Sequence, residues 1–387
     1  MNTSQRATLT AGVAAAFTLA ACSAGGGKTA AVPTVEVPII VATATATALP
    51  VSVDTPWADL GLKGHLLYSL GVQGIHYLDL ATAQERVIFT LPENAWLTAA
   101  SVAADGSSIV LAYAPPPGEG EVQLGYTAIY ALPGDCLTRA ITCTPDDLTV
   151  LVARTDPHEA YFSPIWSPDG QYIYFAHFTP SSTDNTAPFA YTLERLPMAD
   201  SAATGPAEVI LKDALWPSIS ADGGELVYVY SDPKDYTNSL FVANADGSKA
   251  HPLTDPKDFD AVDAPLFTLD GKTVIFSAVG DGPAAAGPGA ALAWLDRLTG
   301  VSLAQASPPA GPLAHNVPSD WWSISVDGGA PARLSNIYDT GMFGDLSPDG
   351  QYMAYISASG LYALPVAGGD PQKLLDVSGF GTLEWVP

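Results

Sequence analysis

Two stretches of this sequence carry residue types that can bind metal ions. The densest acidic run, 255–263, contains four aspartates, and carboxylate oxygens are ligands that calcium prefers. The run lacks the ligand spacing and the glycine of known calcium loops, so a solvated connection between strands is the favoured interpretation. His158-Glu159 begins like the helix of a zinc protease, but Phe162 stands where the second histidine is required. We therefore predict no metal site and no cofactor.

Five Asp-Gly pairs could present a ring of carboxylates. The pairs are Asp105-Gly106, Asp169-Gly170, Asp222-Gly223, Asp270-Gly271 and Asp349-Gly350. Turn formation explains them without a ligand, because an aspartate side chain accepts from a backbone N–H two residues on and glycine adopts the positive φ. We interpret these residues as structural. The sequence also lacks a Gly-x-Ser-x-Gly nucleophile elbow, and we predict no catalytic residues.

The Asp-Gly pairs belong to a repeated hairpin, seen most clearly at 162–176 and 344–357. Each of these copies has a short apolar run, then Ser-Pro-Asp-Gly, then a run that alternates polar and apolar residues, which predicts a β-hairpin. Further strand, turn, strand segments follow some of the hairpins, at 240–254, 322–335 and 361–375. The repeating unit is therefore four antiparallel strands.

This repeat resembles the TolB-type, WD-like Ser-Pro-Asp-Gly repeat, over about 61–387. The resemblance implies an all-β fold, a six-bladed β-propeller of four-stranded antiparallel blades. The ring closes if the terminal strand at 381–386 pairs beside 64–69, with Lys63-Gly64 in the place of an Asp-Gly pair. Closure by the N- and C-terminal strands leaves no free sheet edge. An open, five-bladed or solenoid array is the alternative.

The composition agrees with a large all-β protein. The chain has 387 residues, 14% of them charged, with many glycines and prolines, which suits short strands and tight turns. Its formal net charge of −25 argues against nucleic acid or an anionic membrane surface as a partner, because phosphate would be repelled. No segment after the N-terminus is long and apolar enough to predict a transmembrane helix.

The N-terminus resembles a bacterial lipoprotein signal. Arg6 precedes an apolar stretch, 9–20, that is too short for a permanent span, and Leu19-Ala-Ala-Cys22 ends it like a lipobox. The resemblance implies that 1–21 is a signal peptide and that Cys22 is lipidated and anchors an extracytoplasmic protein to the membrane. An ordinary secretory signal is the alternative.

The rest of the chain divides into a tether and a propeller domain. Residues 22–56 are rich in small residues and proline with almost no charge, and predict a flexible tether. Residues 57–387 form the propeller, with insertions at 115–125, 133–147 and 281–320. We expect no catalytic domain beyond it.

Two insertions carry candidate functional residues. Cys136 and Cys143 are the cysteines left after lipidation, and export into an oxidising compartment implies a disulfide between them. In 281–320 the spacing of four apolar residues predicts one face of a short helix, and two tryptophans follow. This candidate binding surface consists of Leu292, Trp294, Leu295, Leu298, Trp321 and Trp322. A lid packed on its own blade is the alternative.

The preferred functional hypothesis is a non-enzymatic, lipid-anchored, TolB-like platform that binds a protein partner at the cell envelope. One alternative is a solute- or glycan-binding lipoprotein that uses the central channel. Another is an enzyme of lyase or hydrolase type at the channel mouth, against which stands the lack of a placed nucleophile, base or metal set.

Overall fold

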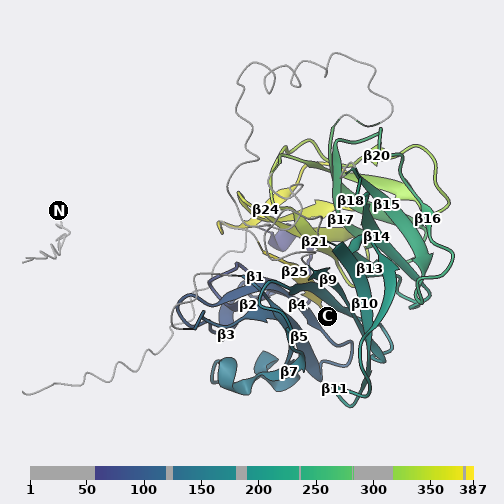
Figure 1. The fold of residues 1–387 in the computed structure, drawn as a ribbon. Helices are drawn as coiled ribbons and strands as arrows, with labels where there is room; N and C mark the ends of the chain where they lie inside the picture. The colour runs from purple at the N-terminus through teal and green to yellow at the C-terminus, as the bar shows by residue number, and fades with distance from the viewer. Residues whose placement is uncertain are drawn as a thin grey trace, which may run out of the picture. The chain divides into compact units, whose positions relative to one another are not determined.

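The computed structural model describes residues 57–118, 125–179, 190–234, 237–280, 282, 317–377 and 381–387. These residues form six antiparallel sheets around a common axis (Figure 1). Their helical elements are 3-10 turns, η1 (Ala58–Leu60), η2 (Gly134–Leu137) and η3 (Pro145–Asp147). The fold is the predicted six-bladed β-propeller, and the open or five-bladed array is excluded. The predicted signal peptide, Cys22 and the tether lie outside the described residues.

Blades two and three are built from consecutive strands. Blade one has three consecutive strands and an innermost strand that comes from the C-terminus. From the axis outward, blade one consists of β25 (Leu383–Val386), β1 (His65–Ser69), β2 (Ile75–Asp79) and β3 (Glu85–Phe89). Blade two consists of β4 (Trp96–Val102), β5 (Ser108–Ala114), β6 (Ala128–Pro133) and β7 (Thr149–Val152). Blade three consists of β8 (Ala160–Trp166), β9 (Tyr172–Thr179) and β10 (Ala190–Ala199), with β11 (Ala202–Ala203) and β12 (Glu208–Lys212). In blade three, β11 and β12 both pair with β10, so the outermost position is divided between them.

Blades four to six repeat the same order with short outer strands. Blade four consists of β13 (Ala214–Ile219), β14 (Glu225–Ser231), β15 (Asn238–Asn244) and β16 (His251–Pro252). Blade five consists of β17 (Ala261–Phe267), β18 (Thr273–Val279), β19 (Asp320–Ser325) and β20 (Ala332–Arg333). Blade six consists of β21 (Phe343–Leu346), β22 (Tyr352–Ser357), β23 (Gly360–Pro365) and β24 (Gln372–Leu375). An outer strand of only two residues, such as β16 or β20, offers few unpaired backbone groups for pairing with another chain.

Pairing of β25 with β1 closes the ring. The ladder is antiparallel, with His65 opposite Val386 and Leu67 opposite Glu384. The indole Nε1 of Trp385 also donates to the carbonyl oxygen of Lys63 at 2.8 Å, just before β1 begins. The predicted closure by the two terminal strands is therefore confirmed.

The Asp-Gly pairs occupy equivalent turns between the first and second strands of blades two to six. The aspartate Oδ1 atoms accept from the N–H groups of Ser107, Gln171, Gly224, Lys272 and Gln351 at 2.9 to 3.1 Å. The glycines have φ between +67° and +73°, a conformation that side chains rarely adopt. These contacts fully account for the aspartates as turn-forming residues.

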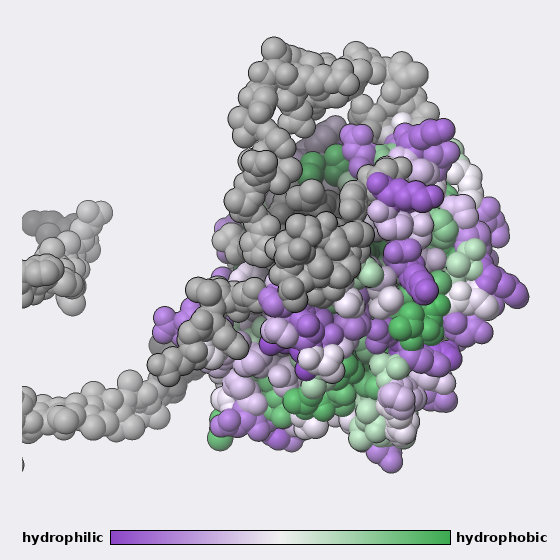
Figure 2. All heavy atoms as spheres, viewed as in Figure 1, coloured by the Kyte–Doolittle hydropathy of each residue, from purple (hydrophilic) through white to green (hydrophobic). Residues whose placement is uncertain are grey.

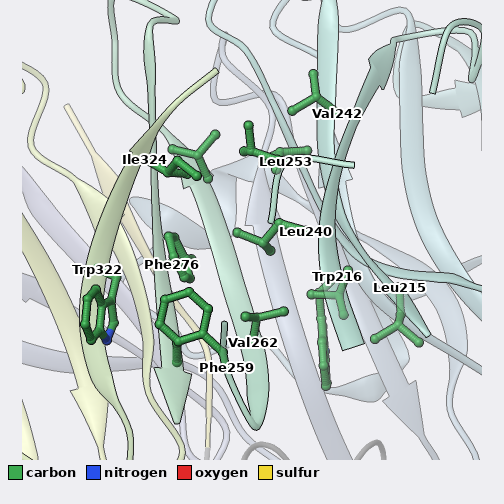
Figure 3. Close-up of a cluster of buried hydrophobic side chains, with 14 of the residues drawn as sticks. Leu215, Trp216, Leu240, Val242, Leu253, Phe259, Val262, Phe276, Trp322 and Ile324 are labelled. Atoms are coloured by element: carbon green, nitrogen blue, oxygen red, sulfur yellow. The ribbon is translucent and has the colours of Figure 1, made fainter. Parts of the chain in front are cut away.

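The core lies between blades, so both faces of the middle strands are buried. In β5 all seven positions are buried, which explains why its sequence is a continuous apolar run. In the cluster that extends over blades three to five, the rings of Phe259 and Trp322 meet edge to face with centroids 5.0 Å apart (Figure 3). On the visible surface, hydrophilic residues predominate around smaller hydrophobic patches (Figure 2).

The two faces of the disc differ in the connections that they carry. We call the face with the Asp-Gly turns the turn face; it also has the connections between third and fourth strands. The opposite face, here the loop face, has the connections between second and third strands. The long connections 115–127, 180–189 and 280–319 begin and end on the loop face, because they follow β5, β9 and β18.

The insertion at 133–147 lies on the turn face and carries the Cys136–Cys143 disulfide. Both cysteines are buried, and the N–H of Cys143 donates to the carbonyl oxygen of Ile88 at 2.9 Å. In return, the N–H of Thr90 donates to the carbonyl oxygen of Cys143 at 3.0 Å. The bridged loop of blade two therefore extends the outer edge of blade one.

Replacing both cysteines with serine (C136S/C143S) should lower the free energy of unfolding by about 2 kcal/mol, because the bridge closes a short loop. Chemical denaturation followed by tryptophan fluorescence measures this loss. The matched control is Thr138→Ser, on the surface of the same loop, which should leave stability within about 0.5 kcal/mol of the parent. Equal stability of the double variant and the parent would contradict a structural role for the bridge.

Candidate functional site

The innermost strands of all six blades surround a cavity of about 220 Å³ at the propeller axis. Each of these strands contributes two or more residues to the wall of the cavity. The wall residues include Ser101, Pro164, Trp216, Pro217, Pro265, Phe343, Asp345 and Glu384. An innermost strand has a neighbour on one side only. Its second edge faces the axis, so any backbone N–H there needs a partner.

Blades three, four and five meet this need with a proline in a bulge. Ser163, Trp216 and Ala264 have φ of 50°, 49° and 44°, and each precedes a proline that lines the cavity. The strand register shifts at each of these three positions. Proline has no N–H, so these three blades place no backbone donor at that point of the wall.

Blades six, one and two each supply a side-chain acceptor for a backbone N–H of the following blade. Asp345 Oδ2 accepts from the N–H of Trp385 at 2.8 Å, and Glu384 Oε2 accepts from the N–H of Val102 at 2.7 Å. Ser101 Oγ accepts from the N–H of Trp166 at 3.4 Å. Each bond runs from one blade to the next. Together they connect blades six, one, two and three across the point where the ring closes.

Asp345 and Glu384 are carboxyl groups in an environment that disfavours charge. Burial raises the pKa of Asp345 to about 6, against the opposing effect of its two backbone donors, Trp385 and Leu346. Burial also raises the pKa of Glu384 to about 8, and the neighbouring charge of Asp345 adds to the shift. At neutral pH this pair therefore holds a proton that an exposed pair would release.

A second buried polar cluster lies in blade three. Nδ1 of His177 is 2.8 Å from Glu194 Oε1, and Nε2 is 3.3 Å from Glu159 Oε2. The ring of Tyr161 stacks on the imidazole with centroids 4.1 Å apart. Burial alone would lower the pKa of His177, but hydrogen bonds and charge from the two glutamates outweigh it and raise the pKa. The cluster fastens β9 and β10 to the connection that enters β8.

Both predicted surface tryptophans are buried, and the prediction that they form a binding surface is wrong. Trp321 and Trp322 are 0% and 5% exposed, and they belong to different clusters. Adjacent strand residues point to opposite faces, and in a propeller both faces of a blade pack against neighbours. The other residues of that prediction, Leu292, Trp294, Leu295 and Leu298, lie outside the described residues.

The acidic run 255–263 follows the outer strand of blade four and enters β17. Phe259 in this run is buried in a core cluster, and Asp263 Oδ1 accepts from the N–H of Ala264 at 2.7 Å. Among the described residues, no group of three or more histidine, cysteine or acidic side chains is placed to hold a metal ion.

Sequence reasoning missed the channel residues, although the repeat contains a signal for them. Pro164, Pro217 and Pro265 each stand five residues before an Asp-Gly aspartate. Asp345 stands four residues before Asp349, where blades three and five have isoleucine and leucine. Aligning the repeats on the Asp-Gly pairs would have shown an acidic residue at a position that is serine in blades two and four and apolar in blades three and five.

No known protein family and no curated protein matches the sequence. Solved structures of similar fold include TolB from Acinetobacter baumannii, with a TM-score of 0.54 and 12% identity over 86% of this chain and 69% of that one. A structure described as a TolB of Agrobacterium tumefaciens has a TM-score of 0.50 and 15% identity, over 84% of this chain and 99% of that one. A chain of a nidogen–laminin complex has a TM-score of 0.50 and 12% identity, over 82% and 97%. These identities show the fold alone, a TolB-type propeller.

Replacing Glu384 with glutamine should flatten the dependence of stability on pH. The folded-state pKa of Glu384, about 8, lies above its ordinary value of 4.5, so the folded protein holds a proton that the unfolded chain releases between these values. Stability from this group is therefore lost as pH rises from about 5 to about 8, and E384Q removes that loss while keeping an acceptor for Val102. Denaturant unfolding at pH 5, 7 and 8.5 measures the difference.

The matched control for this prediction is Asp349→Asn, an acid-to-amide change on the turn face. The pKa of Asp349 is lowered by hydrogen bonds from Ser347 and Gln351, so D349N should not remove the loss between pH 5 and 8. Parallel pH curves for E384Q and the parent would contradict the assignment of a retained proton to the channel.

Replacing His177 with glutamine should destabilise the protein by about 3 kcal/mol at pH 6, because two buried carboxylates lose their cationic partner. The raised pKa of His177 means that its contribution is full below about pH 6.5 and is lost as pH rises through the folded-state value, so the effect of H177Q should shrink by pH 9. Thermal unfolding at both pH values tests this. His158→Gln, on an exposed turn, is the control, and equal losses for the two variants would contradict the prediction.

Proposed function

We propose that this protein is an exported, lipid-anchored, non-enzymatic β-propeller that binds a protein partner at the cell envelope through its loop face. The observation that carries the proposal is the asymmetry of the disc. Loops that vary on a regular scaffold are where proteins usually place binding residues. Here the turn face repeats one turn geometry in five blades and has one long insertion, 133–147, whereas the loop face has three long connections, 115–127, 180–189 and 280–319.

Exposed apolar side chains on the loop face support a protein partner. Val72 is 59% exposed in the β1–β2 connection, and Tyr338 is 52% exposed in the connection that enters β21. Trp96, at the start of β4, and Val317, just before β19, are 37% and 39% exposed. Tyrosine and tryptophan are enriched at protein interfaces because they bury a large apolar area and keep a polar group.

The N-terminus and the disulfide support an extracytoplasmic compartment. The lipobox-like end of 1–21 supports lipidation of Cys22, and the bridged pair Cys136–Cys143 agrees with an oxidising environment. No helix among the described residues is long and apolar enough to cross a membrane. The propeller in the nidogen–laminin complex provides an analogy for a protein-binding role, at the level of fold only.

Site-specific photo-crosslinking in living cells tests the loop face directly. A photo-reactive amino acid at Val72 or Tyr338 should give a crosslinked band of one discrete mass. The same amino acid at Leu269 or Ile141, which are 47% and 80% exposed on the turn face, should not give that band. Crosslinks from the turn-face positions alone, or no crosslink from either face, would overturn the proposal.

Lipid anchoring has a separate test. Cells fed an alkyne fatty acid should label the parent protein, and the protein should sediment with membranes. C22S should lose the label and move to the soluble extracytoplasmic fraction. The apolar stretch 9–20 is too short to span the membrane and so cannot anchor the protein without the lipid. Retention of the label in C22S would contradict lipidation at this cysteine.

A further inference from the structure

We propose that the central channel binds a small organic ammonium ion, with Asp345 and Glu384 as its counter-charges. The site is distinct from the protein-binding face and does not depend on it.

The wall offers acceptors, and at the bulges it lacks donors. Prolines 164, 217 and 265 remove one backbone N–H from the wall in each of blades three, four and five. The N–H groups of Trp385, Val102 and Trp166, in blades one, two and three, are already bound to wall side chains. The two carboxyl groups add acceptor oxygens toward the axis, so a ligand that can donate hydrogen bonds to them is favoured.

The charge of the wall selects a cation. Asp345 and Glu384 are the titratable side chains among the described residues that line the cavity, and no lysine, arginine or histidine faces them there. Two carboxyl groups without a cationic partner are costly to ionise in a confined space. A bound ammonium group would supply the missing charge, and the retained proton would leave to solvent as the ligand enters.

The remaining wall selects an organic cation over a hydrated metal ion. Phe343 and the three prolines are among the apolar residues of the lining. Aromatic faces attract ammonium groups, and alkyl carbon can pack against the prolines. The described residues place no group of three histidine, cysteine or acidic side chains that could hold a metal ion, and a cavity of about 220 Å³ has room for a small organic molecule.

Isothermal titration calorimetry with propylammonium, propan-1-ol and propionate, on the full chain at pH 8, tests the proposal. Propylammonium should bind best, and a proton should be released on binding, which is measured as a fall in pH when ligand solution of the same pH is added to the protein in weakly buffered, amine-free solution. Its affinity should fall as pH is lowered from 8 to 6, since protons then compete for Asp345 and Glu384. E384Q and D345N should each weaken binding about tenfold or more, because each removes one charge-assisted contact.

Two controls keep the result interpretable. D349N changes an acid on the turn face and should bind propylammonium like the parent. Circular dichroism of E384Q and D345N checks that each variant is folded. If only one of the two variants folds, its affinity for propylammonium is sufficient to test the proposal. Equal binding of propan-1-ol, undiminished binding to both channel variants, or no binding of propylammonium up to about 50 mM would overturn the proposal.

Discussion

The backbone ladder between β25 and β1 is the contact on which the rest of the molecule depends. It pairs Leu67 with Glu384, which come from opposite ends of the propeller sequence. Without this ladder blade one would have three strands, and β1 would present a free edge toward the axis. Because each blade buries both faces against neighbours, an opening between blades one and six would expose the cluster that contains Trp57, Leu361 and Trp385.

Closing a ring creates a second requirement, since six innermost strands turn an edge toward the axis. The chain satisfies it in two ways, with prolines in bulges on one side and with Asp345, Glu384 and Ser101 on the other. The acceptor side coincides with the closure point, where the bonds join successive blades. The same choice gives the channel its chemistry, because both carboxyl groups lie on the closure side of the wall. Structure and binding potential therefore have one cause.

The repeat predicted the architecture because local chemistry repeats with it. Ser-Pro-Asp-Gly, which occurs twice, specifies a turn by itself, and three further Asp-Gly copies give the order of five hairpins. The channel acids could not be found in this way, because Glu384 and Asp345 matter through partners on other blades. The surface role predicted for Trp321 and Trp322 failed for a related reason. Local alternation suggests one buried and one exposed side chain, whereas packing between blades buries both.

Cysteine crosslinking across the closure is the most direct test of this account. His65 and Val386 are directly opposite in the ladder, so cysteines at both positions in a C22S background should form a disulfide under mild oxidation. The pair His65 and Trp385, one residue out of register, points to opposite faces of the sheet and should remain reduced. Mass spectrometry of the oxidised protein distinguishes the two pairs. A bridge in the second pair, or none in the first, would contradict closure by the C-terminal strand.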